Sequence, residues 1–470
     1  MNFVGRIAEL KILNQKYNSE KFEFGYLYGQ RRIGKTSLIQ EFANKKNAIV
    51  LFASDSEDIK IRESFSRQFN SQTNSSLTGS TFSDWDFFFE AISSYFGNEK
   101  GLLVIDEYPN IVLTRDGKRK KTDFVSKLQN AIDYHFKYQK FTIILTGSNV
   151  SFMEKEIKDT KAPLYERNTF QLLLHKLEWN EALLCLNGMD DFEKAKVLAL
   201  TSTYPYYLSM IDTSLSFKEN VENLFYSKAA PFIDDPSKVI TSAISEGGFY
   251  SAIIETIANG IHRIKGISES LKVESGKVSK YISELLDAGV LTKRSVFMSS
   301  RLTFYSINDP MLAFYYRFIR GENIELIKLG YGKVIEEKQM NAVDNFIYHN
   351  FENECIEYLS YLNKNGKLGD LYHEFQNFKV ENTSLGRSVE IDIVAQSDSG
   401  LLIGECKLSK NKRTISDYYD MLEDTSIKPF SDYKNIEYYL FGMSGFEKDI
   451  KDINNPHLHL IDSSIMFKTE

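Results

Sequence analysis

The sequence predicts an α/β protein whose first part is a parallel β-sheet with helices on both faces. Short apolar runs typical of buried strands occur at residues 24–28, 50–53, 102–105 and 141–146. Stretches with the apolar period of helices separate these runs. Strands that alternate with helices form parallel sheets, because each helix returns the chain to the same edge. Two more strand candidates within residues 388–407 predict a further α/β domain near the C-terminus.

The composition is that of a globular protein of about three domains. The chain has 470 residues, of which 42% are hydrophobic and 26% are charged. No apolar run approaches the roughly 18 residues of a membrane span, and no signal peptide is recognisable. The three cysteines lie too far apart in sequence for a metal motif or a disulfide framework. We therefore expect a cytoplasmic protein with no membrane partner. The net charge of −7 argues against non-specific nucleic-acid binding over the whole surface.

A glycine-containing loop between the first strand candidate and a helical stretch is the clearest motif. It consists of Gly29, Gln30, Arg31, Arg32, Ile33, Gly34, Lys35 and Thr36, followed by Ser37. The two glycines allow backbone N–H groups to turn toward phosphate oxygens, and the helix N-terminus adds partial positive charge. Lys35 would neutralise the β- and γ-phosphates as a catalytic residue, and Thr36 would bind Mg²⁺. The loop predicts ATP binding by residues 29–37.

Two further strand ends complete this expected site. The run at residues 102–107 ends in Asp106 and Glu107. Asp106 would hold Mg²⁺ directly or through water, and Glu107 would polarise the water that attacks the γ-phosphate. Beyond the next strand, Ser148 and Asn149 either contact the nucleotide as a sensor or form a simple turn. These segments predict an ATP-hydrolysing site that uses Mg²⁺.

The middle of the chain predicts a helix-turn-helix followed by two strands, which is the order of a winged helix. The second helix carries Lys277 and Lys280, and Arg294 follows on the first strand. Residues 251–320 contain 10 basic and 6 acidic residues, a local charge of +4 in an acidic chain. Two interpretations stay open: the module binds DNA, or it is a structural connector or protein-docking surface.

A second candidate site lies near the C-terminus, where residues 388–407 predict a β-hairpin. Alternate residues of a strand share a face, so Glu405 and Lys407 project together, with Asp392 on the partner strand. Two carboxylates can bind Mg²⁺ while the lysine orients a water near a phosphate. Glu352, on an upstream helix, would supply a third carboxylate. We therefore expect Asp392, Glu405 and Lys407 to be catalytic, and Asp392, Glu405 and Glu352 to bind metal.

These motifs resemble those of the archaeal-type ATPases, a family of AAA-like, STAND-related P-loop NTPases. The resemblance rests on the start Phe3-Val4-Gly5-Arg6, the glycine loop with Arg31-Arg32, the pair Asp106-Glu107, the turn Gly147-Ser148 and residues 163–167. The spacing of Asp392, Glu405 and Lys407 is similar to that of PD-(D/E)xK nuclease-like domains fused to many such ATPases. The chain departs from these patterns at Glu166 and Thr203, where glycine is usual, and at Ile391, where proline is usual.

The resemblance implies four domains: a P-loop ATPase core at 1–170, a helical lid at 171–240, a winged helix at 241–322 and a PD-(D/E)xK nuclease-like domain at 323–470. It implies a switch that binds and hydrolyses ATP and acts on nucleic acid. DNA would be bound through the winged helix and the nuclease-like domain, and further partners would be copies of the chain or another protein. The alternatives are a signalling or scaffold ATPase with a degenerate nuclease-like module, or an ATP-gated DNA-binding regulator.

Overall fold

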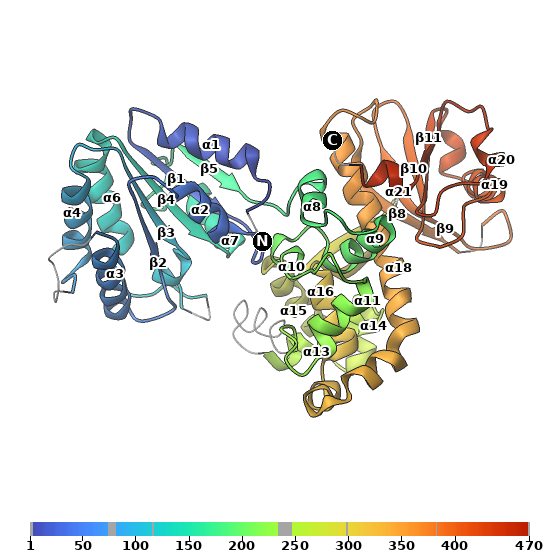
Figure 1. Cartoon of the computed structure of the whole chain (residues 1–470), viewed down its shortest axis with the longest axis horizontal. Helices are drawn as coiled ribbons and strands as arrows, with labels where there is room; N and C mark the ends of the chain where they lie inside the picture. The colour runs from blue at the N-terminus through green and yellow to red at the C-terminus, as the bar shows by residue number, and fades with distance from the viewer. Residues whose placement is uncertain are drawn as a thin grey trace. The chain divides into compact units, whose positions relative to one another are not determined.

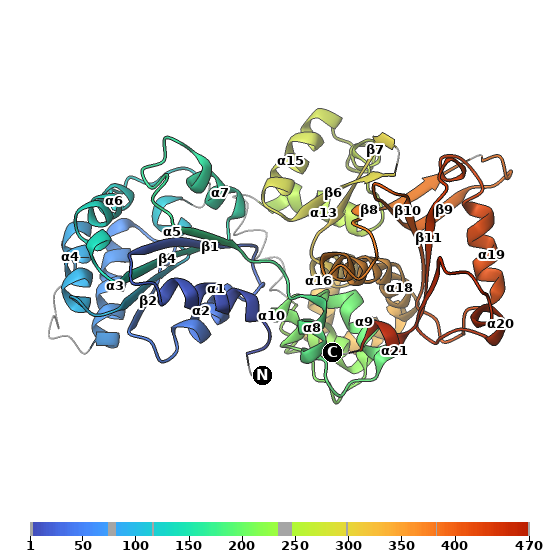
Figure 2. The same cartoon turned by 90° about the horizontal axis from the view of Figure 1, so that it is seen from above.

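The protein was analysed as a computed structural model, which describes residues 3–73, 81–114, 117–233, 247–297, 299–381 and 383–468. The chain divides into two compact units, one built mainly from residues 1–177 and one mainly from residues 178–470 (Figures 1 and 2). Within the described ranges, no helix is long and apolar enough to cross a membrane. The predicted α/β class is confirmed, because each unit contains a β-sheet flanked by helices.

The first unit is built on a five-stranded parallel sheet in the order β2-β3-β4-β1-β5. Its strands are β1 (Glu23–Tyr28), β2 (Ala48–Phe52), β3 (Gly101–Asp106), β4 (Phe141–Gly147) and β5 (Phe170–Leu173). Strand β4 lies between β1, which leads into the glycine loop, and β3, which ends at Asp106. The carboxyl ends of these three strands therefore meet at one edge, where open α/β sheets bind their ligands.

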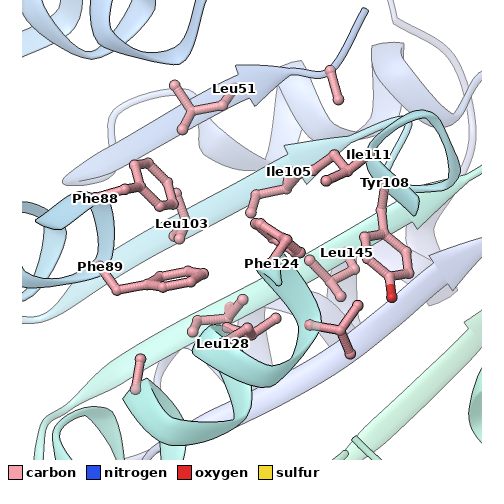
Figure 3. Packing of buried hydrophobic residues seen from close by; sticks show 14 of the residues in the cluster. Leu51, Phe88, Phe89, Leu103, Ile105, Tyr108, Ile111, Phe124, Leu128 and Leu145 are labelled. Carbon is pink, nitrogen blue, oxygen red and sulfur yellow. The ribbon is translucent and has the colours of Figure 1, made fainter. Parts of the chain in front are cut away.

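Helices cover both faces of this sheet. They are α1 (Ile7–Tyr17), α2 (Lys35–Ala43), α3 (Asp58–Thr73), α4 (Trp85–Phe96), α5 (Pro109–Val112), α6 (Phe124–Tyr134), the short 3-10 helix η1 (Phe136–Tyr138) and α7 (Val150–Lys158). Helices α3, α4, α6 and α7 share one apolar core with the strands. In that core Phe88, Phe89 and Phe124 of the helices meet Leu103 and Leu145 of the sheet (Figure 3). Fully buried aromatic rings of this size stabilise a domain strongly.

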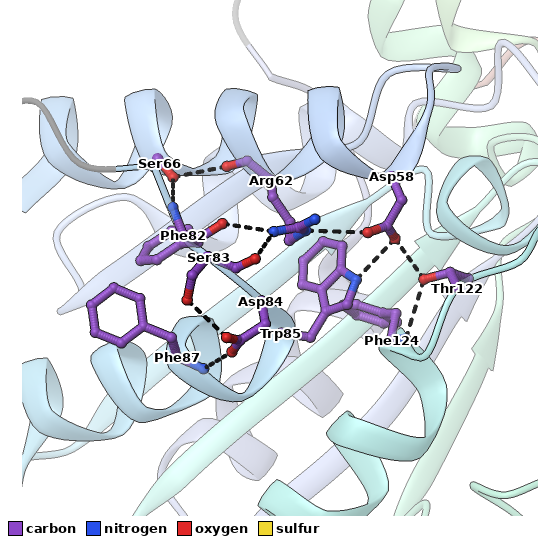
Figure 4. Close-up of polar contacts among 10 residues, drawn as sticks. All are labelled: Asp58, Arg62, Ser66, Phe82, Ser83, Asp84, Trp85, Phe87, Thr122 and Phe124. Atoms are coloured by element: carbon purple, nitrogen blue, oxygen red, sulfur yellow. Dashed lines mark hydrogen bonds and ion pairs between the residues drawn. The ribbon is translucent and has the colours of Figure 1, made fainter.

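A polar network joins the first turn of α3 to its neighbours on this face. Asp58 accepts hydrogen bonds from the indole N–H of Trp85 at 2.9 Å and from the hydroxyl of Thr122 at 2.7 Å (Figure 4). The guanidinium of Arg62 also donates to Asp58, at 3.1 Å. Asp84 begins α4 by accepting the N–H of Phe87 at 2.8 Å, as N-cap residues do. One carboxylate thus fixes two helices and the segment before α6.

The second unit begins with helices and a hairpin. The first group is α8 (Trp179–Cys185), α9 (Asp191–Thr201), α10 (Pro205–Leu208), α11 (Phe217–Val221) and the π-turn η2 (Glu222–Tyr226). Three helices follow, α13 (Gly247–Ala258), α14 (Ile264–Leu271) and α15 (Ser275–Asp287). The antiparallel strands β6 (Leu291–Val296) and β7 (Ser299–Ile307) come next. The predicted sequence of helices and hairpin is therefore present in the structure.

A long helix connects this part to a second sheet. The connecting elements are α16 (Pro310–Phe314), η3 (Tyr315–Ile319), α17 (Glu322–Leu326), η4 (Ile327–Tyr331) and α18 (Gly332–Lys364). The sheet contains β8 (His373–Val380), β9 (Val389–Gln396), β10 (Leu401–Lys407), β11 (Ile436–Gly442) and β12 (Leu458–Ile461), with α19 (Ile415–Asp424), η5 (Phe430–Asp432), α20 (Lys448–Lys451) and α21 (Ser463–Met466). Its order is β12-β11-β10-β9-β8, and β9 and β10 form the predicted hairpin.

The helical part and the C-terminal sheet pack together as one unit. Helix α18 contacts α9 on one side and β10 on the other. The indole N–H of Trp179 in α8 donates to the carbonyl of Met466 at 2.9 Å, and its ring stacks on Phe467. The first contiguous part of the first unit ends at residue 177. The predicted domain boundaries at 170, 240 and 322 all stay predictions.

Candidate nucleotide site and C-terminal carboxylate cluster

The glycine loop folds around the side chain of Lys35. The Lys35 ammonium donates to the carbonyls of Gly29 and Gln30, both at 2.8 Å. A Cβ on Gly29 would lie 2.3 Å from the carbonyl oxygen of Leu174, so only glycine fits there. Gly34 has a φ of 83° as the residue before α2, a conformation that glycine adopts without strain. The loop is therefore shaped by its two glycines and leads directly into the helix N-terminus.

The side chain of Arg6 holds this loop from outside. It is 3% exposed and donates to the carbonyl of Ile33 at 2.8 Å and to that of His175 at 2.7 Å. It also pairs with Glu9 at 3.0 Å. Arg6 thereby fixes the glycine loop to the segment that follows β5. In the sequence, Arg6 appears only as part of the motif that carries the family resemblance. Its contacts could not be predicted, because a single buried arginine produces no periodic pattern.

Thr36 and Asp106 place two oxygen atoms side by side at the start of α2. The Thr36 hydroxyl donates to Asp106 Oδ2 at 2.8 Å, and the Thr146 hydroxyl donates to Asp106 Oδ1. Asp106 is 2% exposed. Mg²⁺ in nucleotide sites takes one or two protein oxygens and completes its shell with phosphates and water. The two side chains fit such an ion, as the sequence predicts.

Ser148 lies beside Glu107, and Asn149 does not. The Ser148 hydroxyl is 3.0 Å from Glu107 Oε1 and 2.9 Å from Oε2. Asn149 instead caps α7 by accepting the N–H of Phe152 at 3.0 Å. Both residues follow β4 as expected, but the cap holds the Asn149 side chain at the start of the helix. Ser148 thus contacts the Glu107 carboxylate, while the nucleotide contacts of Ser148 and Asn149 both stay predictions.

The charges around the loop act on one another. Burial lowers the pKa of Lys35 to about 8, while the carboxylates of Glu107 and Asp106 raise it and Arg31 lowers it further. Glu107 in turn attracts the guanidinium of Arg31. Arg32 has a φ of 70° within the same loop. The loop therefore carries basic side chains, and the carboxylates of Asp106 and Glu107 lie near enough to attract them. This combination suits a phosphate with a bound cation.

The resemblance also leaves open whether Arg167 acts as an arginine finger in trans and whether Pro205, after Thr203, senses the nucleotide. Arg167 forms a bidentate pair with Asp133, with distances of 3.0 Å from Nε and 2.8 Å from Nη2. Pro205 is the first residue of α10, a position that suits proline. Neither placement assigns a role in nucleotide chemistry to these residues.

In the second unit, the three carboxylates predicted to bind metal lie on neighbouring elements. Asp392 and Glu405 lie on the adjacent strands β9 and β10, and Glu352 lies on α18. Burial raises the pKa of Asp392 and of Glu405, and repulsion from neighbouring carboxylates adds to it: Glu352 acts on Asp392, and Asp392 acts on Glu405. Asp392 also accepts the backbone N–H of Cys406 at 2.8 Å. Asp392 and Glu405 thus lie close enough for their charges to interact, and the convergence of all three side chains on one ion stays a prediction.

Lys407 is directed elsewhere. Its ammonium pairs with Asp417 of α19 at 3.3 Å, and Asp417 also pairs with Arg413 at 3.5 Å. Glu352 forms a hydrogen bond with His349, with 3.1 Å between its Oε1 and the ring Nδ1. In the part of the chain that the structure describes, no three His, Cys, Asp or Glu side chains are placed to hold a metal ion together. The catalytic and metal roles of Asp392, Glu405, Glu352 and Lys407 thus stay predictions.

The hairpin β6–β7 packs against this C-terminal part. Phe297, at the tip of the hairpin, is 6% exposed and stacks on Phe430 with 6.0 Å between ring centroids. Its N–H donates to the carbonyl of Asn377 in β8 at 3.1 Å. Arg294 of β6 interacts electrostatically with Glu352 and Glu357 of α18. The sequence left open whether Arg294 contacts DNA or belongs to a connector or docking surface, and the structure places it near these carboxylates.

Comparison with known proteins supports the ATPase part directly. Residues 3–211 match the family described as an ATPase domain predominantly from Archaea, and residues 315–417 match a family of archaeal and bacterial proteins of unknown function. An uncharacterized protein of Methanocaldococcus jannaschii is 26% identical over 93% of this chain and 94% of its own length. An uncharacterized ATP-binding protein of the same organism is 48% identical over 9% of this chain and 75% of its own length.

Among solved structures, the Walker-type ATPase PABY2304 of Pyrococcus abyssi is 19% identical, with a TM-score of 0.48 over 67% of this chain and 96% of that one. The matched family spans the glycine loop, the end of β3 and the end of β4, which the structure brings to one edge of the sheet. Residues 3–211 thus match the model of ATPase domains found predominantly in Archaea, and the protein is a P-loop ATPase.

Proposed function

We propose that the protein is an ATP-hydrolysing switch that acts on DNA, with its nucleic-acid contacts in the second unit. The observation that carries the proposal is that the half-buried carboxylates of Asp392 and Glu405 lie on the paired strands β9 and β10, with Glu352 of α18 near enough to repel both. The nuclease-like interpretation of this domain explains why they gather at one hairpin and one helix.

In the ATPase unit, the loop residues 29–37 would bind the phosphates of ATP, and Lys35 would neutralise their charge. Thr36 and Asp106 would hold Mg²⁺, which supplies further charge neutralisation when it is bound. Glu107 would accept a proton from the attacking water, and Ser148 fixes the orientation of its carboxylate. These roles use side chains that already lie at one edge of the sheet.

In the second unit, α13, α14, α15 and the hairpin have the order of a winged helix. The buried face of α15 carries Val278 and Ile282, while Lys277 and Lys280 are exposed. Because the hairpin is packed against the C-terminal part, we infer that DNA contacts α15 rather than the wing. A helix with exposed lysines can approach the negative backbone of a duplex.

Replacing Lys277 and Lys280 with alanine is expected to weaken DNA binding and to flatten its salt dependence by about one unit or less per lost phosphate contact. Binding of a labelled duplex, measured between low and moderate salt, checks this. The matched control is Lys448→Ala with Lys451→Ala, an exposed pair with the same spacing on α20. Equal loss in both double variants, or no DNA binding at low salt, would favour the protein-docking interpretation.

For the C-terminal site, wild-type protein with Mg²⁺ is expected to cleave plasmid or single-stranded DNA, and Asp392→Ala is expected to abolish cleavage while ATP turnover stays unchanged. The reason is that Asp392 interacts with both Glu352 and Glu405 and would be a ligand of the ion. Cleavage is measured with and without ATP. Asp398→Ala, which changes an exposed carboxylate in the β9–β10 turn, is the control.

The second candidate function is a signalling or scaffold ATPase with a degenerate nuclease-like module. The pair between Lys407 and Asp417 favours it, because a catalytic lysine should be available for water or phosphate. Failure of the wild-type protein to cleave any DNA at millimolar Mg²⁺, together with normal ATP turnover, would support this candidate over the first.

A further inference from the structure

The backbone at Glu107 adopts an unusual conformation. Its φ is 56°, in the left-handed region that residues with a Cβ rarely occupy. On one side lies Asp106, whose carboxylate is held by Thr36 and Thr146. On the other side lies Tyr108. Such a conformation persists only where the surrounding structure fixes it, and strained residues of this kind gather at functional sites.

Tyr108 is anchored at both ends. Its N–H donates to the carbonyl of Thr146 at 2.8 Å, and its side chain is 0% exposed. The ring packs against Phe124 and Phe152, with 6.1 Å and 5.9 Å between centroids, and Figure 3 shows it beside Phe124. The hydroxyl donates to Glu156 Oε2 at 2.8 Å. The residue that follows Glu107 is therefore held by backbone, ring and hydroxyl together.

Glu156 is a buried carboxylate far from the nucleotide loop in sequence. It lies on α7 and is 2% exposed. Its second oxygen pairs with Arg119, whose side chain is 57% exposed. A carboxylate is costly to bury unless it has good partners, so a merely structural position would more simply carry an apolar residue. Helix α7 also follows Ser148, which contacts the Glu107 carboxylate. Two side chains at this helix therefore act near Glu107. Glu156 accepts from the Tyr108 hydroxyl, and Ser148, just before the helix, contacts the Glu107 carboxylate.

We propose that Tyr108 and Glu156 are positioning residues for ATP hydrolysis, and that their hydrogen bond holds the backbone of Glu107 in the conformation that aims its carboxylate at the attacking water. This inference rests on the role proposed for Glu107. The hydrogen bond stabilises the left-handed turn, while Ser148 orients the carboxylate itself.

Tyr108→Phe in the full-length protein removes the hydroxyl and keeps the ring. We expect kcat for ATP hydrolysis to fall about tenfold, because small misplacements of a catalytic group are costly. The KM for ATP should change less than about twofold, because the phosphate contacts of the loop are untouched. Tyr26→Phe is the matched control: this buried tyrosine lies on β1, and its hydroxyl makes no hydrogen bond among the described residues. Its kcat should equal that of the wild type.

The acceptor can be varied in the same way. Glu156→Gln keeps an oxygen that accepts from the Tyr108 hydroxyl, so its kcat should stay close to wild type. Glu156→Leu removes the acceptor and should reproduce the tenfold loss of Tyr108→Phe. If Glu156 has only a structural role, both Glu156 variants should have lower melting temperatures but similar kcat values. If Glu156→Leu fails to fold, the comparison of kcat between Tyr108→Phe and Tyr26→Phe still tests the positioning role of the Tyr108 hydroxyl.

The double variant Glu107→Gln with Tyr108→Phe tests whether the effect passes through Glu107. Residual hydrolysis should equal that of Glu107→Gln alone, since there is no catalytic carboxylate left to aim. A further tenfold loss in the double variant would overturn the proposal, as would an unchanged kcat in Tyr108→Phe. If Glu107→Gln itself retains full turnover, the proposed role of Glu107 fails instead, and the two failures are distinguishable.

Discussion

The Glu107→Gln variant is expected to lower kcat for ATP hydrolysis by about 10²- to 10⁴-fold, the contribution typical of a general base. The amide has the same shape as the carboxylate but cannot take a proton from water. ATP affinity should stay within about twofold, because the loop and Lys35 make the phosphate contacts. The Ser148 hydroxyl can still donate to the amide oxygen, so the local structure should persist. Phosphate release and equilibrium nucleotide binding measure the two quantities.

Glu154→Gln on α7 is a suitable control for that measurement, because Glu154 is a partly exposed carboxylate paired with Lys158. Its turnover should match that of the wild type. Equal turnover in the wild type and Glu107→Gln would remove the catalytic role from Glu107. A large loss of ATP binding in Glu107→Gln would show instead that the carboxylate shapes the empty site, through its attraction to Arg31 and Lys35.

The sheet and the nucleotide site could be predicted because their signals are local. The strand that precedes Gly29, the helix that follows it and the apolar run before Asp106 are each readable within a few residues. Strand ends of a parallel sheet share an edge, so the meeting of Thr36 with Asp106 follows from fold class alone. The β9–β10 hairpin and its two carboxylates follow from strand alternation in the same way.

The remaining features depend on contacts between distant segments. Arg6 meets the carbonyl of His175, and Glu156 meets Tyr108, across long stretches of chain. Neither pairing follows from spacing. Lys407 shares its strand face with Glu405 as expected, but Asp417 of the following helix competes for its ammonium. Such competition is settled by tertiary packing and charge, which a sequence pattern does not contain.

Packing also decides how the second unit is divided. The hairpin tip at Phe297 is buried against Phe430, and the C-terminal Phe467 stacks on Trp179. Aromatic contacts therefore join parts of the chain that the sequence predicts as separate domains. A reading of local sequence patterns assigns each part its own core, because it does not contain these contacts. One consequence is that Arg294, on the same hairpin, interacts with the carboxylates of Glu352 and Glu357 on α18.

Lys35→Ala is expected to weaken ATP binding by about 10²- to 10³-fold, since charge-assisted hydrogen bonds to the β- and γ-phosphates contribute about 1.5–3 kcal/mol each. The variant also leaves the carbonyls of Gly29 and Gln30 without their donor. Lys11→Ala, on the exposed side of α1, is the control and should bind as the wild type does. Isothermal titration calorimetry measures the affinities, and equal affinity in wild type and Lys35→Ala would contradict the assignment.

The same residue predicts a pH dependence of ATP binding. In the empty site the pKa of Lys35 is lowered to about 8, chiefly by burial, and phosphate charge should raise it again when ATP binds. Below pH 8 the ammonium is charged before and after binding, so affinity stays level. Above pH 8 the free protein must take up a proton to bind, so affinity should fall by up to about tenfold per pH unit. Calorimetry at pH 8.5 in two buffers of different ionisation enthalpy should detect this proton uptake in the wild type. Its persistence in a Lys35→Ala protein that still binds ATP would assign the titration to another group.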